Sequence, residues 1–164
     1  MININQELLN NLISKAKLSP RKRMNYNFHN EDADPLQRML NAMEPGTYVQ
    51  PHKHENPDKR EAFWVLTGKF IVFEFDDFGR ITEHTILDAK AQNFGCEINP
   101  RVWHSILPLE TGTVAYEVKD GPYVVAIDKN FAPWAPNENS LERFEYVRKL
   151  FNEVNIEVPD AYLV

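Results

Sequence analysis

The chain of 164 residues is poor in cysteine and glycine and has no long apolar run. Its single cysteine, Cys96, excludes an intrachain disulfide, which is typical of proteins in a reducing compartment. No stretch approaches the roughly 18 consecutive apolar residues of a membrane-spanning helix. The opening residues, MININQELLNNL, have neither the basic nor the apolar region of a signal peptide. We therefore expect a cytoplasmic protein that does not span a membrane.

Positive charge is also scarce. The chain has 18 Lys and Arg residues against 24 Asp and Glu residues, so its formal net charge is −6. Proteins that bind nucleic acids usually carry a basic excess or a basic stripe. The local cluster RKR at residues 21–23 is typical of a solvated segment. We therefore expect no nucleic-acid partner.

The chain does contain enough apolar material for one domain. Hydrophobic residues make up 43% of the sequence and aromatic residues 12%. A domain of this length buries roughly 70% of the surface that its unfolded chain exposes. Residues 5–18 have apolar side chains at helical spacing, and Pro20 would end that helix.

Short β-rich segments dominate from Leu36 to Val118. They include LQRMLNAM, AFWVLTG, KFIVFEF, RITEHTIL, WHSIL and TVAYEV. Gly68 and Lys69, between the second and third segments, predict a tight hairpin, and DDFG at residues 76–79 predicts another turn. Many short strands at close spacing favour an antiparallel sandwich or a small barrel. The predicted fold class is therefore mainly β, with a helix near each end of the chain.

The C-terminal segment returns to a helical pattern, with Asn139 or Ser140 as the capping residue. Apolar residues recur at 3.6-residue spacing, namely Leu141, Phe144, Val147, Leu150, Phe151 and Val154. We predict an amphipathic helix over residues 140–155. Its apolar stripe must cover either its own barrel or a second copy of the chain. We expect a homodimer to which this segment contributes, and the sequence leaves the other alternative open.

Residues 51–68, PHKHENPDKREAFWVLTG, place two histidines and a glutamate near the start of a strand. In a strand, residues i and i+2 face the same side, so His52 and His54 would project together. The segment ENPDKR lets the chain turn back, and Glu61 can then offer a carboxylate oxygen to the same point. His104, in NPRVWHSI, is a fourth candidate at the start of another strand.

Three imidazoles and one carboxylate suit one divalent transition ion such as iron, manganese, nickel, copper or zinc. In an octahedral shell, this donor set leaves two positions for water and substrate. A His-x-His pair is by itself a weak indication, because many such pairs are surface residues of strands. The added glutamate and the distant histidine make a metal site the favoured interpretation.

A metal at the mouth of a barrel needs side chains that hold a substrate, and the segments RMNYNFH and DPLQRMLN offer them. Polar groups inside a small barrel are costly unless they form hydrogen bonds, so these could bind substrate hydroxyls or a phosphate. Taken singly, each is more simply explained as a brace for a loop. The candidate substrate-binding residues are Arg23, Asn25, Tyr26, Asn27, His29, Gln37, Arg38 and Asn41.

Two of these residues, Arg23 and Arg38, suit an anionic group because a guanidinium fork matches a phosphate or carboxylate. In a strand, however, Arg38 faces away from its neighbour Gln37. The candidate catalytic residues are Tyr26 as a proton donor, and Glu117 and Lys119 beside the metal.

The spacing Gly46-x5-His52-x-His54-x6-Glu61-x6-Gly68 resembles the first cupin motif, with a longer gap before the glutamate than usual. Residues 99–104, NPRVWH, resemble the second cupin motif. That motif usually has Pro and Gly where this chain has Asn99 and Arg101, and often an Asn where it has Pro108.

The chain is more specifically similar to the WbuC family of cupin-fold metalloproteins. The matching stretches are SPRKRMNYNFH, DPLQRMLNAMEPGTYVQPHKH, EVKDGPY and DKNFAPWAP. The resemblance implies a single jelly-roll barrel, or double-stranded β-helix, with one metal bound by His52, His54, Glu61 and His104. We expect this cupin domain to extend over residues 1–136, followed by a C-terminal helix and tail at residues 137–164.

The resemblance also implies a setting, because such proteins are often encoded among genes for surface polysaccharide (O-antigen) synthesis. We therefore expect a metal-binding cupin that acts on a small polar metabolite, such as a sugar or nucleotide-sugar, including anionic ones. Isomerase- or epimerase-type chemistry is the leading expectation. An Fe(II)-dependent dioxygenase is the alternative enzyme, and a non-catalytic sugar-binding sensor is a third interpretation.

Overall fold

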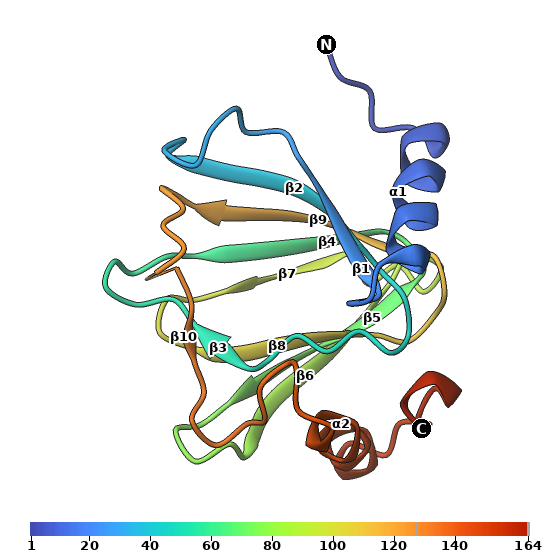
Figure 1. Cartoon of the computed structure of the whole chain (residues 1–164), viewed down its shortest axis with the longest axis vertical. Coiled ribbons are helices and arrows are strands. Elements are labelled where there is room, and N and C mark those ends of the chain that lie inside the picture. The colour runs from blue at the N-terminus through green and yellow to red at the C-terminus, as the bar shows by residue number, and fades with distance from the viewer. Residues whose placement is uncertain (127, 164) are drawn as a thin grey trace.

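Two antiparallel sheets that face each other make up most of the protein (Figure 1). The computed structural model describes residues 1–126 and 128–163. The first sheet has the order β1 (Arg23–Asn27), β2 (Leu36–Met43), β9 (Thr113–Asp120), β4 (Glu61–Thr67) and β7 (Gly95–Ile98). The second has the order β10 (Asn130–Phe131), β3 (His52–Lys53), β8 (Trp103–Pro108), β5 (Lys69–Phe75) and β6 (Ile81–Asp88). This mainly β, two-sheet architecture confirms the predicted fold class.

Helix α1 (Gln6–Leu18) covers the outer face of the first sheet (Figure 1). Asn5 caps the helix, because its side-chain oxygen accepts a hydrogen bond from the backbone N–H of Leu8 at 3.0 Å. The apolar stripe of the helix packs on outward-facing side chains of β2 and β9. The buried cluster consists of Leu9, Leu12, Ala16, Leu40, Ala42 and Val114.

Helix α2 (Glu142–Glu153) covers the outer face of the second sheet. It confirms the predicted C-terminal helix and begins and ends two residues inside the predicted range. Ser140 accepts a hydrogen bond from the N–H of Glu142 at 3.2 Å, although the residue at the N-cap position is Leu141. The apolar face of α2 packs on its own barrel, together with Tyr162 from the short 3-10 helix at Asp160–Tyr162. The buried cluster includes Ile71, Phe73, Phe75, Leu107, Val147, Leu150 and Phe151.

The C-terminal stripe is therefore used within the chain, which is the alternative that the sequence had left open. An interface with a second copy would have to use another surface. Val164, the last residue of the predicted tail, lies outside the described residues.

Gly68 marks the point where the chain leaves the first sheet and enters the second. The predicted hairpin at this position is wrong, because β4 pairs with β7 and β9 whereas β5 pairs with β6 and β8. The backbone of Gly68 has φ +74°, and a Cβ there would lie 2.4 Å from the Thr113 hydroxyl oxygen. Glycine adopts this positive φ without strain and has no Cβ to clash with Thr113. The turn at residues 76–79 does join a hairpin, formed by β5 and β6.

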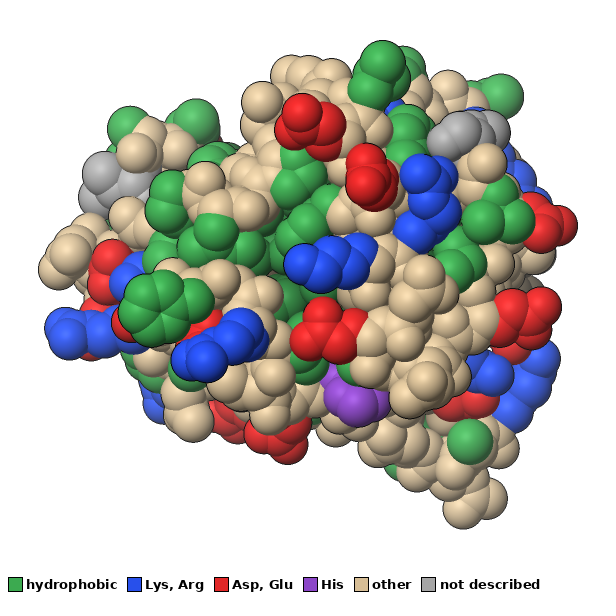
Figure 2. Space-filling model, turned by 90° about the horizontal axis from the view of Figure 1, so that it is seen from below, with side chains coloured by type: hydrophobic (Ala, Val, Ile, Leu, Met, Phe, Trp, Pro, Cys, Tyr) green, Lys and Arg blue, Asp and Glu red, His purple; other side chains and the backbone are tan. Residues whose placement is uncertain are grey.

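The space between the sheets is divided into an apolar end and a polar end. Buried apolar side chains from both sheets fill the first, among them Met43, Val65, Phe70, Val72, Leu87, Ile98 and Ile106. The polar end holds the side chains described below. On the face seen in Figure 2, acidic and basic side chains are interspersed rather than gathered by sign. Among the described residues, no helix combines the length and apolar character needed to cross a membrane.

Candidate metal centre

Four side chains from both sheets meet at the polar end of the barrel. His52 lies on β3 and His54 just after it, His104 lies on β8, and Glu61 is the first residue of β4. His52 and His104 are register partners on adjacent strands, so they project to the same side. All four side chains are buried, and one donor atom from each lies within 4.8 Å of the others. Two opposite ligands of an ion with bonds of about 2.1 Å lie about 4.2 Å apart, so the cluster has the size of a coordination shell.

Backbone carbonyls fix the orientation of the three imidazoles. Each ring donates through Nδ1 to a carbonyl oxygen, which can only accept, so Nδ1 carries the hydrogen and Nε2 of the neutral ring has the lone pair. This outer hydrogen bond is the usual support of a metal-binding histidine. The acceptors are the oxygens of Gln50 for His52 (2.9 Å), Val102 for His104 (2.9 Å) and Asp128 for His54 (2.5 Å).

The Nε2 atoms and the Glu61 carboxylate surround a point where a cation would be stabilised. Glu61 Oε2 lies 2.8 Å from His104 Nε2 and 3.3 Å from His54 Nε2. A lone pair and a carboxylate oxygen repel each other at such distances unless a proton or a metal ion lies between them. His52 Nε2 is buried without a hydrogen-bond partner in the described part of the chain. Burial holds the pKa of His52 well below its usual value, which keeps this ring neutral and able to coordinate. The four residues could therefore bind a divalent transition ion.

The turn before His104 shows how the chain departs from the second cupin motif. Arg101, at the position where glycine is usual, has φ +68° and so adopts the left-handed conformation that glycine favours. Its N–H donates to the carbonyl oxygen of His54 at 3.1 Å, and its guanidinium binds Asp58 at 2.8 Å. For a non-glycine residue this conformation costs about 1–2 kcal/mol. The turn geometry is thus kept with a different residue.

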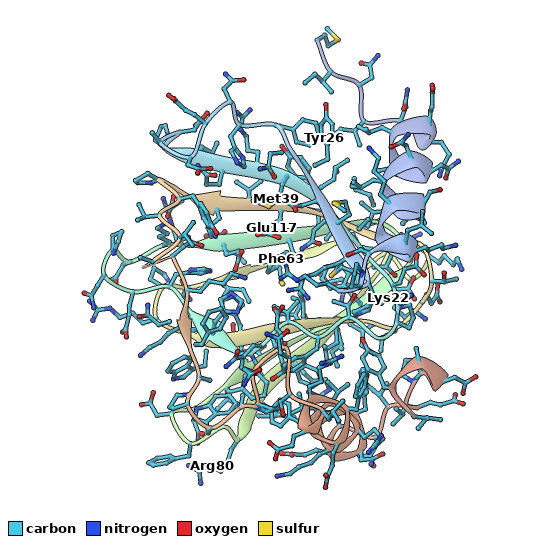
Figure 3. All side chains as sticks on the ribbon, viewed as in Figure 1. Lys22, Tyr26, Met39, Phe63, Arg80 and Glu117 are labelled. Atoms are coloured by element: carbon cyan, nitrogen blue, oxygen red, sulfur yellow. The ribbon has the colours of Figure 1, made fainter. Side chains whose placement is uncertain are left out.

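A cavity of about 480 Å³ adjoins three of the four donors, namely His52, Glu61 and His104. Its floor is the inner face of the first sheet, where register partners project side by side. Met39, Glu117 and Phe63 form one such row across β2, β9 and β4 (Figure 3). The next row, toward the metal centre, consists of Gln37, Lys119 and Glu61.

The structure brings most of the predicted substrate-binding residues to this cavity. The residues that line it are Arg23, Asn25, Asn27, His29, Gln37 and Asn41. Arg23 already has partners within the protein, because it binds Glu138 and donates to the carbonyl oxygen of Tyr48. Burial lowers the pKa of Arg23, although Glu138 opposes this shift.

Tyr26 and Arg38 lie on the outer face of the first sheet instead. They occupy strand positions that alternate with the inward-facing ones. Tyr26 packs edge-on against Phe28, with ring centroids 5.2 Å apart, on the side of α1 (Figure 3). Arg38 donates to the carbonyl oxygen of Phe28 and lies 3.7 Å from Asp34. Of the two arginines expected to bind an anion, only Arg23 reaches the cavity.

Glu117 and Lys119 both line the cavity, as expected for candidate catalytic residues. Asn41 donates to Glu117 Oε2 at 3.2 Å. Burial, together with the neighbouring Glu61 carboxylate, raises the pKa of Glu117 to about 8. A cation at the metal centre would lower it again. Burial would lower the pKa of Lys119, but the surrounding carboxylates of Glu61, Glu117 and Asp128 raise it.

The sequence interpretation missed residues in the connection between β9 and β10. Asp128 is buried, its carboxylate binds Lys119 at 2.6 Å and Lys59 at 2.7 Å, and its carbonyl orients His54. Lys129 follows it and lines the cavity. The pKa of Lys129 is lowered by burial, while Glu61 opposes this shift. The connection has no helical or strand period, so no alternation of side chains marks these residues in the sequence.

Comparisons with known proteins place the chain in a family and confirm the fold. A family described as a domain of unknown function (DUF6016) matches residues 4–87. A search of curated proteins finds no match.

Three solved structures illustrate the likeness. L-ribose isomerase from Cellulomonas parahominis with L-psicose has a TM-score of 0.53 and 16% identity, over 74% of this chain and 73% of that one. CapF from Staphylococcus aureus, a capsular polysaccharide assembling protein, has a TM-score of 0.54 and 19% identity, over 65% of this chain but 28% of CapF. Oxalate oxidase with the substrate analogue glycolate has a TM-score of 0.52 and 14% identity, over 88% of this chain and 71% of that one. At such identities the likeness is one of fold, and the fold is the cupin jelly roll.

Proposed function

We propose that this chain, which belongs to the DUF6016 family, is a metal-dependent enzyme that acts on a small polar metabolite. The observation that carries the proposal is the shared cavity, which is lined by Glu117 and by three members of the four-donor cluster, His52, Glu61 and His104. A sugar or nucleotide-sugar is the proposed substrate class. The proposed reaction is isomerisation or epimerisation beside a carbonyl group.

The residues of the cavity suit such a proton transfer. His52, His54, Glu61 and His104 would hold a divalent ion, which polarises a carbonyl or holds neighbouring oxygens of a substrate. Glu117 takes a proton from the carbon beside the carbonyl and returns it, because burial raises the pKa of this carboxyl and makes its carboxylate a stronger base than an exposed one. Asn41 orients this carboxyl through its hydrogen bond to Oε2. Lys119, held by Asp128, keeps a positive charge beside the reacting oxygens.

The setting is proposed from resemblance. The similarity of the motifs to the WbuC family supports a role in surface polysaccharide (O-antigen) metabolism in the cytoplasm. The fold is shared with a protein named L-ribose isomerase and with one described as a capsular polysaccharide assembling protein. A homodimer stays a prediction.

Solvent isotope exchange tests the proposed reaction. The protein, loaded in turn with each candidate metal, is incubated in D₂O with a panel of aldoses, ketoses and nucleotide-sugars. We expect deuterium to enter one carbon-bound position of a substrate, and we expect Glu117→Gln to stop this exchange without lowering metal content. His52→Ala should lose both metal and exchange. Full exchange by Glu117→Gln would refute the assignment of this residue.

The same experiment separates the alternatives. The donor set also suits Fe(II), and the fold is shared with oxalate oxidase, so an Fe(II)-dependent dioxygenase is the second candidate. Consumption of O₂ without deuterium exchange would favour it. Ligand-induced stabilisation with no turnover on any member of the panel would favour a sugar-binding sensor.

A further inference from the structure

Lys129 is held in place from both sides and lines the cavity beside the metal centre. Asp128 is anchored through its carboxylate and through a bond from its N–H to the carbonyl oxygen of Val124 at 2.8 Å. Asn130 pairs with Lys53 in the ladder of β10 and β3, and its side chain donates to the carbonyl oxygen of Glu55 at 3.1 Å. The backbone of Lys129 is therefore fixed, and its side chain is partly buried in the cavity wall.

The other basic side chains of the inner wall have acidic partners, and Lys129 does not. Lys119 binds Asp128, and Arg23 binds Glu138. Among the described residues, Lys129 forms no ion pair or hydrogen bond. Its ammonium is close enough to the metal centre to be the main charge that disfavours protonation of His52.

The balance of charge changes when a metal binds. The ammonium groups of Lys59, Lys119 and Lys129 balance the carboxylates of Asp128, Glu61 and Glu117. A divalent ion thus leaves two positive charges without counterions. The remaining charged residues of the wall, Arg21 and Asp32, are exposed, where water screens their charge.

We propose that the substrate carries an oxyanion, either a carboxylate or a phosphate, and that Lys129 binds this group beside the metal centre. An unpaired charge in a partly buried site is costly, so an anionic ligand is favoured there over a neutral one. An ammonium serves a carboxylate or a phosphate as a point charge with three donors. This inference rests on the proposed function and names its substrate class. It gives Lys129 the role that the sequence had assigned to Arg23 and Arg38.

Calorimetric titration with matched sugars tests the assignment. The metal-loaded protein is titrated with D-glucose, D-glucuronate and D-glucose 6-phosphate, which share a ring and differ in charge. We expect at least one anionic probe to bind roughly ten- to a hundred-fold more tightly than glucose, as for a hydrogen bond to a charged group. The tighter of the two anions distinguishes a carboxylate site from a phosphate site.

Variants of Lys129 and a matched control complete the test. Lys129→Met should abolish the preference for the anion, and Lys129→Arg should retain most of it. Lys53→Met removes the same charge next to His52 but outside the cavity wall, since Lys53 binds Glu55 and lies over the Trp103 ring. This control should keep the full preference. Metal content and circular dichroism verify that each variant is folded.

Each outcome of these titrations either supports or refutes an anion site at Lys129. Equal affinity for the three probes, absence of binding by both anions, or an unchanged preference in Lys129→Met would overturn it. Because binding is measured without turnover, it is separable from the proposed reaction. An anion preference that depends on Lys129, without turnover of any substrate, would support the site and refute the enzyme. Turnover of a neutral sugar that is insensitive to Lys129→Met would do the reverse.

Discussion

Replacing Glu117 by glutamine should change how the stability of the metal-free protein depends on pH. The pKa of this carboxyl is about 8 in the folded protein, against an ordinary value of 4.5. Between these values the folded protein holds a proton that the unfolded chain has released. The free energy of unfolding therefore falls as the pH rises through this window. The contribution is fully present below about pH 4.5 and is lost above about pH 8.

The size of the effect follows from the two pKa values. At about 1.4 kcal/mol per pH unit, their difference corresponds to about 5 kcal/mol. This is an upper limit, because Glu61 lies beside Glu117 and part of the proton affinity belongs to the pair. For a chain of this length, a loss of that size would lower Tm by roughly 10–20 °C.

Urea unfolding of the two metal-free proteins from pH 5 to pH 9, at constant ionic strength, measures the effect. Glutamine has the shape of the carboxyl and does not titrate, so the variant should lose less stability than the wild type as the pH rises. Groups such as His52 titrate in both proteins and cancel in the difference. Metal loading should shrink the difference, because a nearby cation lowers the pKa of Glu117. Parallel stability curves from pH 5 to pH 8 would refute the reasoning.

Three further outcomes test the metal centre and the packing of α2. Glu61→Gln should lower the metal content measured by mass spectrometry, because an amide lacks the charge of the carboxylate, whereas Glu97→Gln at an exposed position should not. Metal at a hundred times its Kd should stabilise the protein by about 2.7 kcal/mol, or roughly 5–11 °C in Tm, and a chelator should reverse this; an unchanged Tm would contradict metal binding. Phe151→Ala should cost about 3–5 kcal/mol in chemical denaturation, and Leu141→Ala, at a side chain 81% exposed, less than about 0.5 kcal/mol; equal losses would mean that α2 is not docked.

The strands and the joint projection of His52 and His54 were predictable because both follow a local rule. Alternation along a strand places His52 and His54 on the same side of the chain and Lys53 on the other, and the sequence segment LQRMLNAM coincides with β2. The same alternation separates Tyr26 from Asn25 and Asn27. Because all three residues lie in one polar segment, the sequence had suggested that all three bind the substrate. Side chains alternate along the strand, however, and Tyr26 lies on the outer face. The alternation rule also predicted that Arg38 faces away from Gln37, and the structure agrees.

Other features depend on which strands meet, and no local pattern states this. A glycine with positive φ suits a hairpin and a crossover between sheets equally well, so Gly68 was assigned to the wrong one. The apolar spacing of α2 likewise does not determine which surface the helix packs on. Lys129 lies in an irregular connection, and it reaches the cavity wall beside Asp128, which binds Lys119 and the distant Lys59.

The ring of His54 is fixed by a carbonyl oxygen 74 residues farther along the chain. Contacts between such distant residues slow folding, because closing a long loop loses chain entropy before the contact is gained. During synthesis, the His52–His54 pair emerges well before His104 and before the carbonyl of Asp128 that orients one of its rings. A growing chain would thus present a loose and unselective pair of imidazoles. Binding of a metal by all four donors would have to follow closure of the barrel, so the timing of metal uptake would report when the connection between β9 and β10 has docked.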